Sequence, residues 1–181
     1  RRARRPEDWD EAEQLLERLR GTELPPADNR DRVLQCRIRI SLAYCLYLKH
    51  LRKIQEPYER YRAIADRTEG LLKEAAALGA SLSLREQGQI ANTRGLLHKW
   101  EARVALTAED RDANYDAAEG CFRQALTIWQ LAEDRYSLVV ALYNLGDLAF
   151  NRYDIRSGRA GESLIRESLG WYELSASFTD S

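Results

Sequence analysis

Residues 141–150, ALYNLGDLAF, contain the pattern on which the fold depends. Apolar residues recur there at intervals of three and four positions, which places them on one face of a helix; they are Leu142, Leu145, Leu148 and Ala149. Gly146 interrupts this face, although a glycine inside a helix costs about 1 kcal/mol relative to alanine. We interpret the glycine as the point where a second helix crosses too closely to leave room for a Cβ atom.

The following segment, residues 158–169, supplies a suitable partner helix. Small and apolar residues recur on its matching side, namely Gly161, Leu164, Ile165, Ser168 and Leu169. Two helices that are joined by a short turn and pressed together at small residues make a helical hairpin. Because one hairpin cannot bury its own apolar face, we expect further hairpins beside it.

The same pattern occurs upstream. Residues 91–95, ANTRG, align with residues 142–146, LYNLG. In the second helix of each pair, the key residues advance by three, four and three positions; they are Tyr115, Ala118, Phe122 and Ala125 in one segment and Trp9, Ala12, Leu16 and Leu19 in another. Both of these segments begin with an aromatic residue, Asp, any residue and Ala, so the chain is built from repeats.

These motifs resemble the tetratricopeptide repeat, whose first helix carries a Leu-Gly cluster and whose second helix carries an aromatic–Ala–Phe–Ala ladder. The sequence ALYNLGDLA, followed by ESLIRESLGWYE, is most similar to the repeats of bacterial signal-transduction ATPases and transcriptional regulators. The resemblance implies an all-α, right-handed solenoid of antiparallel helix pairs with about seven helices. The chain departs from the regular period of about 34 residues, because Gly95 and Gly146 are further apart and Arg94 replaces a leucine.

Helix signals divide the chain into seven predicted helices without any strand. Their ranges are 7–20, from 29 or 31 to about 52, 57–79, 83–105, 113–132, 135–152 and 159–175. The sequence Ser83-Leu84-Arg85-Glu86 is a capping box that opens the fourth helix. We expect the polar insert 107–114, with its acidic pair Glu109 and Asp110, to form a turn.

The length of 181 residues predicts a single domain, covering residues 1–181. No apolar run approaches the ~18 residues of a membrane span, and the first residues lack the apolar segment of a signal peptide. We therefore expect a cytoplasmic location and no membrane partner. The chain has no methionine, and its first helix lacks a partner, so we expect a fragment of a longer protein.

The residues that usually carry catalysis or bind metals do not form a recognisable motif. Cys36, Cys45 and Cys121 are not at metal or redox spacing, and neither His50 nor His98 has an acidic residue at ligand spacing. There is no glycine-rich phosphate loop and no nucleophile elbow. We therefore predict a protein that is not an enzyme, with no catalytic residue, no metal site and no cofactor.

Basic residues raise the alternative of a nucleic-acid partner. Arginines and lysines are frequent between residues 30 and 62, but Asp31, Glu56 and Glu59 lie among them. The isoelectric point is about 6.2, below the range typical of nucleic-acid-binding domains. Nucleic acid is therefore the disfavoured partner, and a steep salt dependence of binding would be needed to support it.

The resemblance also places a concave groove on the first helix of each pair. By position, the groove residues are Tyr44, Tyr47, Asn92, Lys99, Tyr143, Asn144, Asp147 and Asn151. Asparagine amides can donate to and accept from a peptide backbone, and tyrosines add contact area with a polar tip. We predict a protein- or peptide-binding sensor or scaffold domain of a larger regulator, in which Asn92 and Asn144 matter most. A solvated wall, or one covered by flanking domains of the full-length protein, is the alternative.

The last predicted helix suggests a second kind of surface. Trp171 and Tyr172 lie on it, and its outer face would normally meet another repeat. We therefore expect an oligomer or domain interface there, and a structural self-association module is the alternative function. Alanine at Asn92 and Asn144 separates the two functions, because it would abolish binding in the groove without changing the oligomer. Trp129, by contrast, is predicted to be a core residue.

Overall fold

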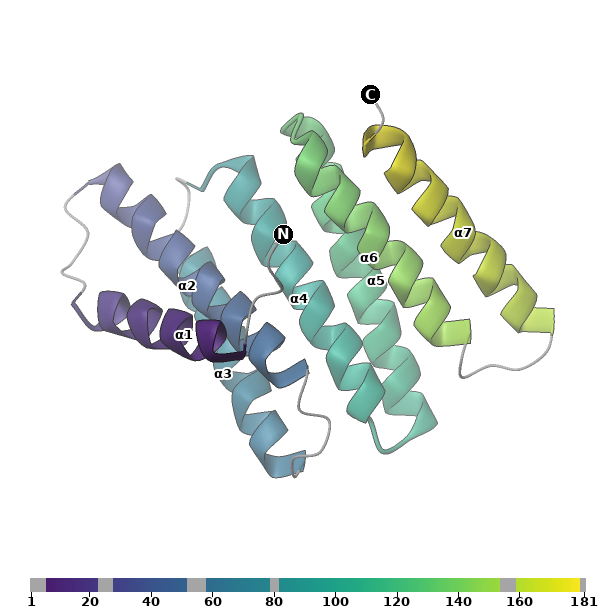
Figure 1. Cartoon of the computed structure of the whole chain (residues 1–181), viewed down its shortest axis with the longest axis horizontal. Coiled ribbons are helices and arrows are strands. Elements are labelled where there is room, and N and C mark those ends of the chain that lie inside the picture. The colour runs from purple at the N-terminus through teal and green to yellow at the C-terminus, as the bar shows by residue number, and fades with distance from the viewer. Residues whose placement is uncertain (1–5, 23–27, 52–57, 79–81, 154–158, 180–181) are drawn as a thin grey trace. The chain divides into compact units, whose positions relative to one another are not determined.

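The computed structural model describes residues 6–22, 28–51, 58–78, 82–153 and 159–179. These residues form seven α-helices and no strand (Figure 1). The helices are α1 (Pro6–Gly21), α2 (Asn29–Leu51), α3 (Tyr58–Ala77), α4 (Leu84–Val104), α5 (Ala108–Leu131), α6 (Arg135–Tyr153) and α7 (Arg159–Thr179). The all-α class predicted from the sequence is therefore confirmed.

Short polar side chains begin several of these helices by accepting hydrogen bonds from free backbone N–H groups. The carboxylate of Asp28 accepts from the Asp31 backbone at 2.9 Å, and that of Asp134 accepts from the Ser137 backbone at 3.1 Å. Ser83 Oγ accepts from the Glu86 backbone N–H at 3.5 Å, and the Glu86 carboxylate bonds back to the Ser83 hydroxyl. Ser83 thus caps the start of α4 as predicted, although Glu86 accepts from the Ser83 hydroxyl and not from the backbone N–H that a full capping box uses.

The prediction of a polar turn over residues 107–114 is wrong, because α5 begins at Ala108. Thr107 is its N-cap, and the Thr107 hydroxyl accepts from the Asp110 backbone N–H at 3.0 Å. Glu109 and Asp110 lie in the first turn, where negative charge stabilises the positive end of the helix dipole. The acidic pair is therefore a helix-start signal rather than a break between helices.

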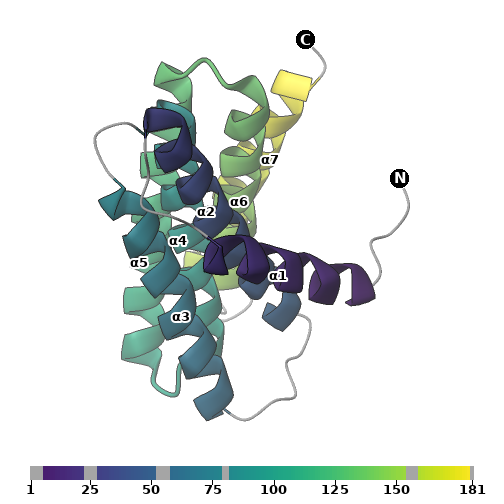
Figure 2. The same ribbon diagram turned by 90° about the vertical axis from the view of Figure 1, so that its left-hand side faces the viewer.

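The helices pack into two compact units, residues 1–86 and 87–181, and the boundary falls in the first turn of α4. In the first unit, α2 contacts both α1 and α3, and α1 lies across α2 rather than along it (Figures 1 and 2). In the second unit, α6 contacts both α5 and α7. The single domain expected from the chain length stays a prediction.

The core of the second unit is the residue ladder of α5. Tyr115, Ala118, Phe122, Ala125 and Trp129 are each at most 2% exposed. The three-and-four spacing that predicted this face is therefore confirmed, and so is the prediction of Trp129 as a core residue. An adjoining cluster joins Ala125 and Trp129 to apolar residues of α4 and α6, namely Ala91, Leu138 and Ala141.

Glycines of α4 and α6 allow aromatic rings to pack on the helix backbone. A Cβ atom on Gly95 would lie 2.6 Å from the Phe122 ring, and one on Gly88 would lie 2.2 Å from the Trp129 indole nitrogen. A Cβ atom on Gly146 would lie 2.8 Å from the Tyr172 ring. The close approach predicted from Gly95 and Gly146 is confirmed, whereas Gly88 was not singled out from the sequence.

Two hydrogen bonds fix how α6 and α7 lie along each other. Ser168 Oγ donates to the Gly146 carbonyl at 2.8 Å, and Ser175 Oγ donates to the Val139 carbonyl at 3.2 Å. The residue number rises along α7 as it falls along α6, so the two helices run in opposite directions. The hairpin predicted for these two helices is therefore present, and Ser168 lies against Gly146.

Candidate functional site

Four consecutive residues of α6 point in four directions, because each residue of an α-helix is turned by about 100° from the last. Leu145 faces the core, Gly146 faces α7, and Asn144 faces α4. Tyr143 is the residue left on the open side, where it is exposed. The local sequence Tyr-Asn-Leu-Gly thus assigns one face of α6 to the core, two to neighbouring helices and one to solvent.

Two of the predicted groove residues bind each other. Asn144 Nδ2 donates to Asn92 Oδ1 at 2.8 Å, and both side chains are buried between α4 and α6. This bond leaves the amide NH2 of Asn92 and the side-chain carbonyl of Asn144 without a hydrogen-bond partner among the described residues. The pair therefore stabilises the contact between α4 and α6 and keeps one donor group and one acceptor for a further polar contact.

Three more groove residues form a second polar cluster between the same helices. The buried ammonium of Lys99 forms an ion pair with Asp147 Oδ2. Asn151 Nδ2 donates to the other carboxylate oxygen of Asp147 at 3.2 Å. The charge of Asp147 is thus already compensated within the protein, and this cluster adds no net charge to the surface.

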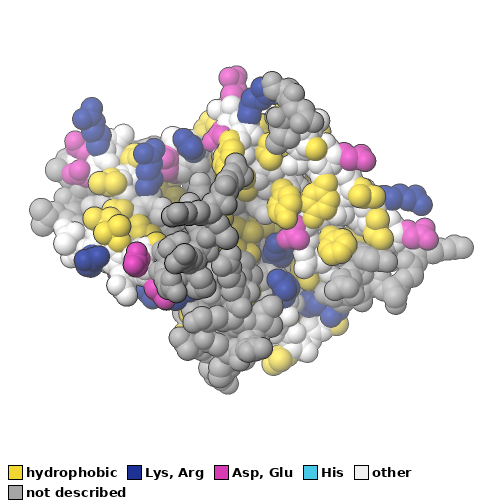
Figure 3. Space-filling model, in the orientation of Figure 1, with side chains coloured by type: hydrophobic (Ala, Val, Ile, Leu, Met, Phe, Trp, Pro, Cys, Tyr) yellow, Lys and Arg dark blue, Asp and Glu magenta, His cyan; other side chains and the backbone are white. Residues whose placement is uncertain are grey.

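Three aromatic residues follow one another on the open side of α6, and we call them the α6 aromatic strip: Tyr136, Tyr143 and Phe150. Their exposed fractions are 77%, 55% and 53%. Each is seven residues from the next, which corresponds to two helical turns or about 10.5 Å. Hydrophobic side chains gather on the face over α6 and α7 in the space-filling view (Figure 3).

Helix α7 extends the α6 aromatic strip sideways. The Tyr143 and Tyr172 rings lie 5.5 Å apart between centroids, tilted by 46°. Leu169 is exposed and lies one helical turn before Tyr172, on the same side of α7. Burial, and then the nearby Asp147 carboxylate, raises the pKa of the Tyr172 hydroxyl. Tyr172 therefore remains neutral and supports the exposed ring of Tyr143.

Trp171 and Tyr172 are half-buried, because each packs against a neighbouring helix. Tyr172 packs on Gly146 of α6. Trp171 lies under the Arg123 guanidinium of α5, 5.4 Å from its ring centroid, and its indole N–H donates to Glu167 at 3.2 Å. Because residue 146 is a glycine, there is room for the Tyr172 ring beside the α6 backbone. The exposed leucines of α7 are Leu169 and Leu174, and the interface role of this helix stays a prediction.

The two remaining groove residues belong to the first unit. Tyr44 and Tyr47 of α2 stack on each other, with ring centroids 6.4 Å apart and planes inclined by 19°. Tyr47 is buried and Tyr44 is only just exposed, so together they present little free aromatic surface. Among the predicted groove residues, Asn92 and Asn144 are joined by a hydrogen bond, and Lys99, Asp147 and Asn151 are joined by an ion pair and a hydrogen bond.

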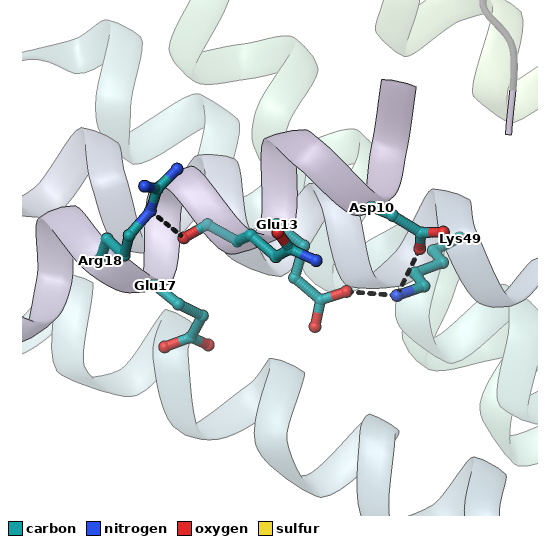
Figure 4. A pocket seen from close by; sticks show the side chains of 6 residues that line it. Asp10, Glu13, Glu17, Arg18 and Lys49 are labelled. Carbon is teal, nitrogen blue, oxygen red and sulfur yellow. Dashed lines mark hydrogen bonds and ion pairs between the residues drawn. The ribbon is translucent and has the colours of Figure 1, made fainter. Parts of the chain in front are cut away.

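The first unit contains a cavity of about 620 Å³ beside α1, lined by Asp10, Glu13, Gln14, Glu17, Arg18 and Lys49 (Figure 4). Lys49 Nζ lies 2.7 Å from carboxylate oxygens of both Asp10 and Glu13. Burial opposes the charge of Lys49, but these two hydrogen bonds outweigh it and raise the pKa of the ammonium. The charges of this cavity therefore hold α1 against α2, and they need no ligand to explain them.

Other kinds of site find no support in the described residues. No group of three or more His, Cys, Asp or Glu side chains there is arranged to hold a metal ion. Burial raises the pKa of the Cys36 thiol to about 11, so this cysteine is unreactive near neutral pH. Over the same residues, no helix combines the length and the apolar character that crossing a lipid bilayer requires.

The chain was compared with protein-family models, curated proteins and solved structures. No protein-family model, no curated protein and no solved structure matches it.

Two of the residues that matter most were missed from the sequence. Tyr136 and Phe150 were not predicted as groove residues together with Tyr143, although seven residues separate each of the three from the next. A search for aromatic residues at that spacing on the side of α6 opposite Leu145 would have found them.

Proposed function

We propose that this chain is a non-catalytic recognition module that binds a segment of another protein across α6 and α7. The observation that carries the proposal is the exposure of the α6 aromatic strip. A fully exposed aromatic side chain presents about 200 Å², so Tyr136, Tyr143 and Phe150 together present on the order of 350 Å². Exposed apolar patches of a few hundred Å² commonly mark surfaces that bind proteins.

The polar groups around the strip support binding to a protein rather than to a small charged ligand. The α4–α6 contact offers one amide donor and one amide acceptor, from Asn92 and Asn144. The charged residues Lys99 and Asp147 are paired with each other. An interface with an aromatic centre and few unpaired charges is the composition that protein–protein contacts favour.

The resemblance to tetratricopeptide repeats fits this proposal and extends it. The contacts of Gly95 with Phe122 and of Gly146 with Tyr172 are those expected where the two helices of one pair cross. We propose on this basis a right-handed solenoid of helix pairs that serves as a sensor or scaffold region of a larger cytoplasmic regulator.

A displayed library of random peptides, selected on the chain, tests the proposed function. Selected peptides are then measured against Tyr143→Ser/Phe150→Ser, which removes two rings of the α6 aromatic strip. We expect binding to weaken at least about tenfold, because the rings supply the central apolar contact. The measurement is fluorescence anisotropy with labelled peptides.

The matched control is Leu106→Ser/Leu131→Ser, which removes two apolar side chains that are 85% and 70% exposed near the ends of α5. Binding should not change in this control. Equal binding to all three proteins would exclude the strip as the binding surface, and a library without any binder would exclude the function. Circular dichroism before and after heating shows whether each variant keeps its fold.

Alanine at Asn92 or Asn144 is a poorer test than the sequence suggested. Removing one amide leaves the other buried without its partner, which costs about 1–3 kcal/mol of stability. Loss of binding in such a variant would then follow from a loosened α4–α6 contact as readily as from a lost ligand contact. The exposed rings of the strip avoid this ambiguity.

A further inference from the structure

We infer that the occupant of the α6 aromatic strip is an amphipathic α-helix with apolar residues on one face and a basic residue at its edge. This inference rests on the proposed function and adds the conformation and chemistry of the bound segment.

The spacing of the strip matches a helix better than an extended chain. Its rings repeat every ~10.5 Å, which is two turns of an α-helix, so a helix lying along α6 repeats its contacts at the same interval. An extended strand repeats its side chains on one face every ~6.6 Å. After one contact, the side chains of such a strand no longer align with the rings of the strip.

Backbone hydrogen bonding favours the same occupant. Tyr136 and Phe150 are separated by about 21 Å along α6, a distance that an extended peptide covers with about six residues. The backbone N–H and C=O groups of those residues would need partners on the protein. The surface offers mainly rings, and the amides of Asn92 and Asn144 supply one donor group and one acceptor. A helix satisfies its backbone groups internally.

An unpaired acid on α7 specifies the charge of the partner. Glu173 is exposed and forms no ion pair with any described residue. It follows Tyr172 and lies one turn after Leu169, which places it at the edge of the apolar face. The other exposed acid on this side of α7, Glu162, is 3.7 Å from Arg166. A lysine or arginine on the bound helix would therefore meet Glu173.

Two displayed libraries of equal composition and about 21 residues test the inference. One places apolar residues at the first and fourth positions of each heptad, and the other places them at alternate positions. We expect the heptad library to yield the binders, with basic residues enriched beside its apolar face. Tyr143→Ser/Phe150→Ser should weaken these binders at least about tenfold, whereas Leu106→Ser/Leu131→Ser should not. A central proline in a selected peptide should abolish binding.

A charge reversal sharpens the electrostatic part. Glu173→Lys should weaken a lysine-bearing peptide about threefold to tenfold at low salt, and a peptide with glutamate in place of that lysine should recover on the variant. Arg166→Glu, one exposed charge changed on the same helix, is the control and should not show this recovery. Unchanged affinity in Glu173→Lys would overturn the basic edge of the partner.

The remaining outcomes separate this inference from the proposed function. Enrichment of the alternating library, still dependent on Tyr143 and Phe150, would keep the recognition function and overturn the helical occupant. Analytical ultracentrifugation could instead show a dimer that Tyr143→Ser/Phe150→Ser dissociates. This result would assign the strip to a second copy of the chain and overturn the inference. If neither library yields binders, both proposals fail.

Discussion

Helices α5 and α1 contain the same aromatic–Asp–x–Ala motif, followed by apolar residues at the same spacing, yet their apolar faces are buried to different depths. In α5 the ladder residues are almost completely buried, including Phe122. In α1, Ala12 and Leu16 are half-buried and Leu19 is 43% exposed. Spacing therefore determines which face of a helix turns inward, and the neighbouring helix determines how deeply that face is buried.

The neighbours differ in chemistry as well as in fit. Helix α4 presents Gly88 and Gly95, and aromatic rings of α5 rest on its backbone. Helix α1 is held by ion pairs instead, from Lys49 of α2 to Asp10 and from Arg67 of α3 to Glu13. Burying an aromatic ring stabilises a fold by several kcal/mol, whereas partly exposed ion pairs contribute about 0–1 kcal/mol each. We expect α1 to be the more weakly held of the two.

The largest expected effect comes from truncating one ladder residue in each helix. Phe122→Ala should lower the free energy of unfolding by about 3–5 kcal/mol, because it leaves a large cavity beside Gly95. Leu19→Ala should lower it by less than about 1 kcal/mol, because that side chain is already in contact with water. Urea unfolding, followed by tryptophan fluorescence, measures both. Similar losses in the two variants would show that the two ladders are equally important.

Alanine at two glycines should change stability by a smaller amount and in opposite directions, which tests the contact of an aromatic ring with the α4 backbone. Gly88→Ala should destabilise the chain by about 1–2 kcal/mol, because the new methyl group would overlap the buried Trp129 ring and outweigh the gain in helix propensity. Gly120→Ala in α5 should stabilise it by about 0.5–1 kcal/mol, since no atom lies within 4 Å of the added Cβ. Thermal unfolding compares them, and stabilisation by both changes would show that the α4–α5 contact is loose.

The smallest effect concerns pH and the ion pairs of α1. The pKa of Lys49 is raised in the folded chain above the ordinary 10.5. The stabilisation from its bonds to Asp10 and Glu13 is therefore complete below pH 10.5 and is lost as the pH rises through the higher folded-state value. We expect Lys49→Met to lower the free energy of unfolding by up to about 1 kcal/mol at pH 8. The variant should also lack the fall in stability that deprotonation of Lys49 causes at high pH.

Lys73→Met is the matched control, since Lys73 is exposed on α3 and forms no ion pair with a described residue. The midpoints of urea unfolding at pH 8 and pH 11 distinguish the effects of the two substitutions on stability. If both substitutions shift the midpoints alike at both values, the Lys49 bonds do not hold α1.

Much of the fold could be predicted from local sequence because helical periodicity and capping are local properties. The α5 ladder, the helix cap at Ser83 and the close contacts of Gly95 and Gly146 all follow from spacing within a few residues. The start of α5 was predicted too late because a polar insert and a capped first turn have the same composition. Only the Thr107 hydroxyl, placed to accept from the Asp110 backbone, distinguishes them.

The candidate site was less accessible to such reasoning. The sequence predicted that Asn92 and Asn144 both line the groove, but not that their side chains bind each other. It also predicted an interface at Tyr172, but not that this ring packs in the space left by Gly146. Which polar or aromatic side chain finds a partner depends on distances between helices, and sequence spacing does not contain those distances.

By itself, the sequence of this protein determined its helices and the face that each of them turns inward, since both depend on a repeat of 3.6 residues within a single segment. The tertiary structure decided which of those faces are covered, because burial requires a second helix at the right distance. It left Tyr136, Tyr143 and Phe150 more than half exposed and paired Lys99 with Asp147. The proposed recognition surface is therefore a property of how α4, α6 and α7 pack.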